Sequence, residues 1–258
     1  IFQHNVDLLH GPIFQSLVIF ALPLFLSNVF QQLYNTVDTI IVGQAVGTSA
    51  LAAVGSTGNL TNLIVNFYVG LSTGASVVIA QYYGAQNNKK IHQAVHTSYV
   101  LAIVSGILMM LFGLFFSYQC LDAIGTPHDI LNDATLYMQL YFLCMIPGAI
   151  YNIGAGILRA VGDSKRPLYY LIVCSIVNVV FDFIFVVIFH QGIAGAAIAT
   201  VIAQSVCAIL VTIQLMRTNE VYKLTLSKMK FHLPVLKKII MIGAPAGIQS
   251  TMYSISNI

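Results

Sequence analysis

Long stretches without formal charge limit what this chain can fold into. From Leu8 to Tyr83 the only charged residue is Asp38, and from Pro167 to Met216 the only one is Asp182. Only 7% of the 258 residues are charged, whereas about 25% is usual for a soluble domain. A chain with so few charges cannot cover a water-facing surface. The sequence therefore predicts an all-α polytopic membrane protein.

Apolar blocks of about 20 residues or more are long enough to cross a ~30 Å hydrocarbon layer. Complete spans are expected at 14–42, 52–82, 94–118, 134–158, 167–189 and 193–216, and a further span begins near Leu236. We interpret 1–216 as a six-helix amino-terminal lobe and 217–235 as a cytoplasmic connector that lies partly on the membrane surface. Residues 236–258 are then the truncated start of a second lobe.

The basic residues fall into alternate connections between the expected spans. They follow the second, fourth and sixth spans, and they are Lys89, Lys90, Arg159, Lys165, Arg166, Arg217, Lys223, Lys228, Lys230, Lys237 and Lys238. The third connection instead carries Asp122, Asp129 and Asp133. The positive-inside rule places the basic connections in the cytoplasm. We therefore expect a multi-pass protein of the inner (cytoplasmic) membrane with a cytoplasmic N-terminus.

A segment near the start of the chain is repeated near its end. Leu17–Pro23 reads LVIFALP, and Ile239–Pro245 reads IIMIGAP. Both copies place a proline about seven residues into an apolar helix. Paired halves related by an axis along the membrane normal are a known transporter architecture. The repeat predicts that this chain holds one lobe of a two-lobe, twelve-helix transporter and the beginning of the other lobe.

Polar side chains recur at spacings of three and four along the first two spans, which places them on one helical face. In the first span these are Asn28, Gln31, Asn35 and Asp38, and in the second span Asn59, Asn62 and Asn66. Such side chains avoid lipid tails. They either form hydrogen bonds between helices or line a solvated pathway. We interpret the asparagines and Gln31 as a substrate pathway.

Four oxygen-bearing residues are expected at a similar depth in the membrane. At 1.5 Å per residue, Asp182 lies about 22 Å above the cytoplasmic start of its span and Thr200 about 10 Å below the outer end of the next span. Asn178 precedes Asp182 by one turn, and Asp38 lies in the outer half of the first span. Hard cations prefer such oxygen ligands. Two neighbouring buried carboxylates also titrate jointly.

The sequence thus predicts a site for a sodium ion or a proton at Asp38, Asn178, Asp182 and Thr200, with no other metal and no cofactor. The alternative is a protonated aspartate that donates a hydrogen bond between helices. Pro23 removes a backbone hydrogen bond inside the first span and tends to kink it. That kink is either static or changes with the charge state of Asp38.

Two other patterns have weaker support. His92 and His96 have the spacing of a metal-binding pair, but no third ligand is evident, so we favour an amphipathic helix end. The four cysteines are widely spaced without a CxxC pair, which indicates neither a disulfide framework nor a zinc site.

These residues together resemble the multidrug and toxic compound extrusion (MATE) family, DinF-like branch. The resemblance is carried by the first span from Ala21-Leu-Pro23 through Tyr34-Asn-Thr-Val-Asp38-Thr-Ile-Ile-Val-Gly43, by the connection Leu158-Arg-Ala-Val-Gly-Asp163-Ser-Lys-Arg-Pro167, and by Asn178-x-x-x-Asp182 followed by Thr200. It implies two six-helix lobes around a central cavity, alternating access without ATP, and a proton or sodium site on these aspartates, Asn178 and Thr200.

The expected function is a cation-coupled antiporter that exports drugs or other organic, chiefly cationic, compounds. We expect a monomeric transporter in the lipid bilayer, not an enzyme, with no nucleic-acid partner. One alternative is a lipid-linked precursor flippase, but its basic cavity residues are missing from the spans. A second is an intramembrane aspartyl protease, but Asp38 follows Val37 and Asp182 follows Phe181 rather than the residues of the protease signatures. The third is a half-transporter without activity.

Overall fold

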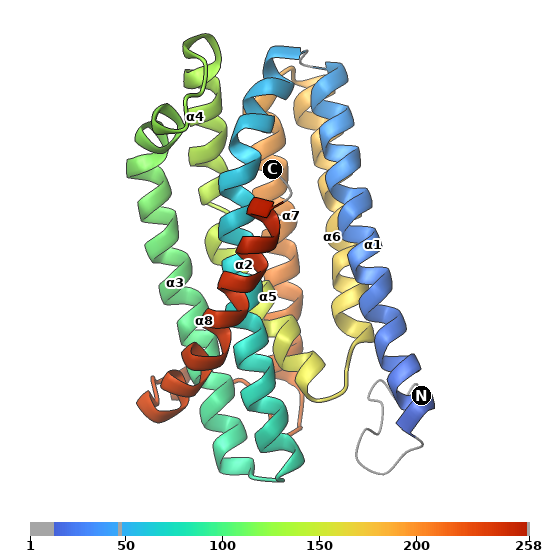
Figure 1. The fold of residues 1–258 in the computed structure, drawn as a ribbon. Helices are drawn as coiled ribbons and strands as arrows, with labels where there is room; N and C mark the ends of the chain where they lie inside the picture. Colours follow the sequence, from blue (N-terminus) through green and yellow to red (C-terminus); the bar gives the residue numbers. More distant parts are fainter. Residues whose placement is uncertain (1–12, 46–47, 257–258) are drawn as a thin grey trace.

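The computed structural model describes residues 13–45 and 48–256, and every regular element in that part of the chain is a helix (Figure 1). The prediction of an all-α fold is confirmed. The helices are α1 (Ile13–Ala45), α2 (Thr48–Gly84), α3 (Asn88–Ala123), α4 (His128–Phe142), α5 (Met145–Ala160), α6 (Lys165–Asp182), the π-helix η1 (Phe183–Ile188), α7 (Gly192–Arg217), the 3-10 turn η2 (Leu226–Lys228) and α8 (Leu233–Ser256).

Several helices have the length and composition needed to cross a bilayer. Within the described residues these are α3, the continuous stretch Lys165–Ile188 formed by α6 and η1, and α7. The bent pair α4 and α5 makes a fourth span if the two are counted together, and α1 contains the shorter apolar stretch Leu17–Leu33. Large apolar side chains such as Phe115 (70% exposed) and Ile176 (60%) face outward. An outer surface of this kind suits hydrocarbon rather than water.

The fourth expected span, 134–158, is not one helix. The chain breaks at Leu143 and Cys144, and α4 and α5 meet at an angle of 45°. The physical reason is Pro147 in the first turn of α5. Its ring clashes with the carbonyl of Leu143, four residues earlier, and it has no N–H to continue the helix. The proline is visible in the sequence, and the expectation of a continuous helix overlooked it.

The fifth expected span, 167–189, also departs from a regular α-helix. The α-helix ends at Asp182, and the last turns are a π-helix that the apolar pattern did not predict. The backbone N–H of Phe189 donates to the carbonyl of Ile184 at 2.9 Å, which is an i to i−5 bond. Short π-helical turns occur frequently at functional sites. This turn begins directly after Asp182, one of the two acids that the sequence singles out.

The two ends of the bundle carry opposite charges. The α2–α3 and α5–α6 connections and the chain between α7 and α8 lie at one end, and the α3–α4 and α6–α7 connections lie at the other (Figure 1). All eleven Lys and Arg residues therefore gather at the first end, and Asp122, Asp129 and Asp133 at the second. The alternation read along the sequence is thus a separation in space.

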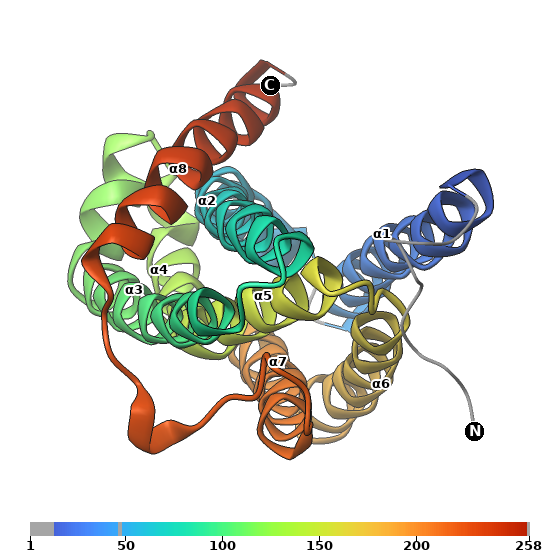
Figure 2. The same ribbon diagram turned by 90° about the horizontal axis from the view of Figure 1, so that it is seen from below.

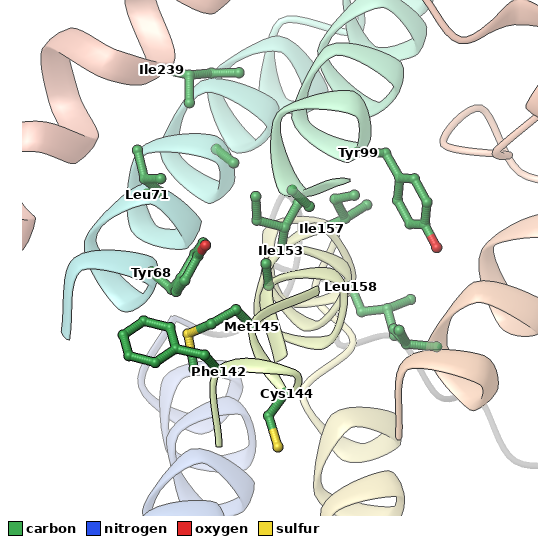
Figure 3. Packing of buried hydrophobic residues seen from close by; sticks show 14 of the residues in the cluster. Tyr68, Leu71, Tyr99, Phe142, Cys144, Met145, Ile153, Ile157, Leu158 and Ile239 are labelled. Carbon is green, nitrogen blue, oxygen red and sulfur yellow. The ribbon is translucent and has the colours of Figure 1, made fainter. Parts of the chain in front are cut away.

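The core lies between α2, α3 and α5 and continues to the break between α4 and α5 (Figure 3). Tyr68 and Leu71 of α2 face Ile153 and Ile157 of α5, and all four are buried. At the break, Phe142 fills the space above Gly113 of α3, where even a single Cβ atom would clash with its ring. The break is therefore packed into the core rather than exposed at the surface.

The segment between α7 and α8 is attached to the basic end of the bundle. Tyr222 and Leu224 are buried, and the backbone N–H of Leu224 donates to the carbonyl of Leu215 at 2.8 Å. Phe231, further along, is 41% exposed. The expected surface connector is thus anchored at its start and open toward its end.

Helix α8 begins at Leu233, with Pro234 in its first turn, and crosses α2 closely (Figure 2). Glycines on both helices allow this approach. A Cβ atom added at Gly70 would lie 2.3 Å from the Cα of Gly247, and one added at Gly74 would lie 2.4 Å from the carbonyl oxygen of Ile239. Small residues at a crossing let two membrane helices bring their backbones into contact. The crossing joins the start of the second repeat copy to α2.

Candidate cation site

Asn178 and Asp182 occupy the last turn and a half of α6, just before the π-helix. They lie four residues apart, so both side chains fall on the same face of the helix. Both residues are fully buried, at 0% exposure, and both carboxylate oxygens of Asp182 are buried. A carboxyl group is rarely kept in such an environment without a function. The structure therefore places this pair inside the protein rather than in lipid.

Thr200 of α7 lies beside this pair. The Nδ2 group of Asn178 donates a long hydrogen bond to Thr200 Oγ1 at 3.5 Å, and that hydroxyl donates to the carbonyl of Ala196 at 3.0 Å. Thr200 is 6% exposed. The helix rise predicted that Asp182 and Thr200 lie at nearly the same depth, whereas the contact in the structure joins Thr200 to Asn178, one turn before Asp182.

Small side chains hold α6 and α7 together around the polar group. The thiol of Cys174 donates to the carbonyl of Ala203 at 3.1 Å, one turn below Asn178. Above it, a Cβ atom at Gly195 would lie 3.0 Å from the Cβ of Phe185 in the π-helix. The two helices are therefore fixed on both sides of the site. In such a packed frame, the oxygens of Asn178 and Thr200 have little freedom to move apart.

Helix α1 packs along α6 and also contacts α7 and η1, so its backbone closes one side of the site (Figure 2). Asp38 lies in this helix, but its side chain is outside the described residues. The structure thus brings Asn178, Asp182 and Thr200 together and sets the helix of Asp38 beside them. The fourth predicted ligand remains a prediction.

Pro23 is inside α1 and is buried. One turn later, the hydroxyl of Ser27 donates to the carbonyl of Pro23 at 2.8 Å. A proline removes one backbone bond, and a hydroxyl bonded to the carbonyl four residues earlier often bends a helix. Two features that favour bending are therefore found in the same two turns of α1.

The predicted substrate pathway is described only in part. Asn28 of α1 is exposed, and Gln31 and Asn66 are half-buried. The side chains of Asn35, Asn59 and Asn62 are outside the described residues. Whether these residues form one pathway stays a prediction.

The chemistry of the site is that of oxygen atoms alone. Asn178 Oδ1 is buried and has no hydrogen-bond partner among the described residues. A buried amide oxygen left unpaired costs about 1–3 kcal/mol. Its free electron pairs, together with a carboxylate and a hydroxyl, suit a proton carrier or a sodium ion. Within the described residues, no group of three His, Cys, Asp or Glu could hold a metal ion.

Sequence reasoning missed the role of His96. Its Nδ1 donates to the carbonyl of His92 at 2.8 Å, and its Nε2 accepts from the backbone N–H of Thr225 at 3.0 Å. The carbonyl oxygen of Thr225 also lies 3.1 Å from Nε2, so both backbone polar groups of Thr225 lie next to the ring. His96 therefore fastens the segment after α7 to α3, and the i, i+4 spacing with His92 reflects a helix end rather than a metal site. Its distant partner could not be read from the sequence.

The connection between α5 and α6 is also more structured than its sequence suggested. Gly162 has φ +89°, a conformation that favours glycine. Asp163, which is fully buried, accepts from the backbone N–H of Arg166 at 3.1 Å and forms an ion pair with its guanidinium at 3.1 Å. The aspartate thus fixes the start of the helix that carries Asn178 and Asp182.

Comparison with known proteins identifies relatives for this arrangement. The MatE family model matches residues 23–184. The chain is 30% identical over 255 residues to the probable multidrug resistance protein YoeA of Bacillus subtilis. The aligned region covers 95% of this chain and 55% of that protein. It is 28% identical over 185 residues to the DNA damage-inducible protein F of Escherichia coli. This alignment covers 71% of this chain and 40% of that protein.

A solved structure described as the outward-facing conformation of a multidrug resistance MATE family transporter of the MOP superfamily superimposes with a TM-score of 0.90 at 27% identity. The match covers 97% of this chain and 56% of the other. The chain spans about half the length of the curated relatives it matches. The likeness extends over nearly every described helix, including α8.

Proposed function

Because the chain belongs to the MatE family of multi-pass membrane transporters, we propose that it forms the amino-terminal lobe of a cation-coupled exporter of drugs and other organic cations. Homologous proteins are named as multidrug resistance or multidrug export proteins, which supports drug export. The division into a lobe (1–216), a connector (217–235) and the start of a second lobe (236–258) is part of this proposal. So is the inner-membrane location with the basic end in the cytoplasm, which the positive-inside rule supports.

The observation that carries the proposal is the buried group of Asn178, Asp182 and Thr200 between α6 and α7. It combines a carboxylate, an amide oxygen without a described partner and a hydroxyl. Asp38 of the neighbouring helix α1 supplies a second carboxylate in this proposal. Two carboxylates at close range do not both ionise readily without a cation between them. The site therefore accepts either one proton or one sodium ion as the coupling ion.

The coupling mechanism acts through α1. Binding of the cation changes the charge between Asp38 and Asp182 and so the attraction between α1 and α6. Pro23 and Ser27 make α1 the helix best able to respond by bending. Substrate bound along the polar face of α1 is then released when the cation enters from outside. Reciprocal coupling of this kind needs only that each ligand favours a different conformation of the same helix.

The test is Asp38→Asn in the full-length protein, assayed for efflux of a fluorescent organic cation from membrane vesicles. Proton and sodium gradients are imposed separately, so that the active gradient identifies the coupling ion. We expect gradient-driven efflux to be abolished because the neutral amide cannot exchange a cation. Membrane insertion, measured by the amount of protein in the vesicles, should be unchanged.

The matched control is Asp133→Asn, which removes an exposed acid of α4 that lies outside the candidate site. It should leave efflux at the wild-type rate. Undiminished efflux by Asp38→Asn would refute the assignment of the cation site. Transport of a lipid-linked precursor in place of the organic cation would favour the flippase. Peptide cleavage that is lost in both Asp38→Asn and Asp182→Asn would favour the protease.

A further inference from the structure

Three helices bring two positive charges to one aromatic ring at the basic end of the bundle. The Nζ atoms of Lys90 and Lys238 each lie 5.5 Å from the centre of the Tyr82 ring. Tyr82 is near the end of α2, Lys90 is in the first turn of α3, and Lys238 is in the first two turns of α8. The two ammonium groups are thus no further apart than twice that distance, although they come from segments far apart in the sequence.

Neither lysine has an acidic partner in the part of the chain that the structure describes. The ion pair found at this end joins Arg166 to Asp163, and that carboxylate is buried in the α5–α6 connection. The other described acid at this end is Glu220, beyond the end of α7. Cation–π contacts favour each lysine separately, but they do not neutralise the two charges. An anion placed between the ammonium groups would do so.

We propose that Tyr82, Lys90 and Lys238 form a binding site for the headgroup of an anionic phospholipid. The chemistry it recognises is a phosphate that carries at least one negative charge. Basic groups between the ends of membrane helices bind anionic headgroups from the cytoplasmic leaflet, and tyrosine is enriched at that boundary. The inference rests on the proposed function only through the orientation of the bundle in the membrane.

The surroundings of the site favour a lipid over a soluble phosphate. One turn into the membrane from Lys238, the side chain of Met241 is 64% exposed, and Ile240 is 42% exposed. An acyl chain that continues from the headgroup would lie on this apolar surface. Lysine side chains at such a boundary keep their ammonium groups among the headgroups while their stems cover apolar surface. A free phosphate would use the two charges but not the apolar surface.

The experiment measures lipid binding to the full-length protein by native mass spectrometry, with phosphatidylglycerol and with phosphatidylcholine. The test variant is Lys90→Ala/Lys238→Ala. The matched control is Lys89→Ala/Lys237→Ala, which removes the same charge from the neighbouring positions of the same two helices. We expect the test variant to bind phosphatidylglycerol about tenfold less tightly, the control to change by less than about twofold, and phosphatidylcholine to bind equally weakly to all.

Equal loss in both double variants would overturn the proposal, because it would show a diffuse basic surface rather than a site at Tyr82. Displacement of phosphatidylglycerol by millimolar inorganic phosphate would show a site for free phosphate and would overturn the lipid assignment. Unchanged binding of phosphatidylglycerol in the test variant would also overturn it. A further variant, Tyr82→Leu, should weaken binding, whereas Tyr82→Phe should not.

This experiment is independent of transport. Phosphatidylglycerol binding is measured without an ion gradient, so a failure of Asp38→Asn to stop efflux would leave the lipid site untouched. Conversely, loss of the lipid site would leave the cation site untouched. All four lysines are exposed, so the variants should fold, which gel filtration checks.

Discussion

At the scale of single residues, the amide of Asn178 is the most informative group in the site. A buried oxygen without a described partner is a cost that the fold carries. Asp182 and Thr200 add a carboxylate and a hydroxyl beside this oxygen. A bound cation or proton would interact with these groups and so offset the free-energy cost of the unpaired oxygen. The neighbouring hydroxyl of Thr200 donates to the carbonyl of Ala196. The residue whose removal separates stability from function is therefore Asn178.

We predict that Asn178→Leu leaves the protein as stable as the wild type, or slightly more stable, but removes its response to the coupling ion. Leucine has the same branched arrangement of side-chain heavy atoms and no unpaired oxygen. A ligand that binds only the folded state raises stability by about 2.7 kcal/mol at a hundred times its dissociation constant. Melting temperature in detergent should rise for the wild type as the sodium concentration increases or as the pH falls, according to which ion binds, and should stay flat for the variant.

The control for this prediction is Ser175→Ala, which lies in the same helix and whose hydroxyl donates to the carbonyl of Leu171 within that helix. It should keep the full response to the ion. A strong loss of stability in Asn178→Leu without any ion would show that the amide is needed for packing, and the cation assignment would lose its main support.

At the scale of helices, the contact between α2 and α8 depends on glycine. We predict that Gly74→Leu destabilises the protein by about 3 kcal/mol, because its Cβ would lie 2.4 Å from the carbonyl of Ile239, which cannot yield without moving the backbone. Gly58→Ala in the same helix is the control, since nothing lies within 4 Å of its added Cβ. Thermal unfolding in detergent compares the two variants. Equal melting temperatures for Gly74→Leu and Gly58→Ala would contradict the close contact between α2 and α8.

The segment after α7 gives a second prediction at this scale. His96→Phe should release it from α3, because the backbone N–H of Thr225 loses its acceptor, at a cost of about 1–3 kcal/mol. Limited proteolysis should then cut between Arg217 and Leu233 faster than in the wild type. His128→Phe, at the opposite end of the bundle, should leave the rate unchanged. Equal cleavage of both variants would show that Tyr222 and Leu224 hold the segment without the histidine.

The same elements show how far the sequence alone could predict the structure. The length of the apolar stretches and the alternation of charged connections were sufficient to predict an all-helical fold, because the thickness of a bilayer sets the length of a span and its two sides differ in charge preference. The helix rise was sufficient to bring the end of α6 near Thr200, although the estimate concerned Asp182 and the contact is made by Asn178. The break at Leu143 could have been predicted from Pro147. The π-turn after Asp182 and the bond from His96 to Thr225 could not, because both depend on packing between segments distant in the sequence.

At the scale of the whole molecule, the proposed cation site lies between α6 and α7 and the proposed substrate pathway lies along α1 and α2, so the proposed exporter works only if the two are coupled. In a one-for-one exchange of a monovalent ion for a monovalent organic cation the charges moved cancel, so a tenfold gradient of the coupling ion, about 1.4 kcal/mol, sustains at most about a tenfold substrate gradient. That energy reaches the substrate only if cation binding changes substrate affinity. Reciprocity then requires substrate to weaken cation binding by the same factor.

We therefore predict that Asp182→Asn in the full-length protein still binds the organic cation but no longer responds to the coupling ion. In the wild type, the dissociation constant of a fluorescent substrate should rise about five- to 150-fold as sodium or protons saturate the site. In Asp182→Asn it should be constant, since the amide carries no exchangeable charge, and Asp133→Asn should behave like the wild type. A substrate affinity that still followed the ion in Asp182→Asn would place the coupling site elsewhere in the protein. An affinity lost altogether would mean that the carboxylate binds substrate directly, and that the two ligands compete for one site instead of acting through the bending of α1.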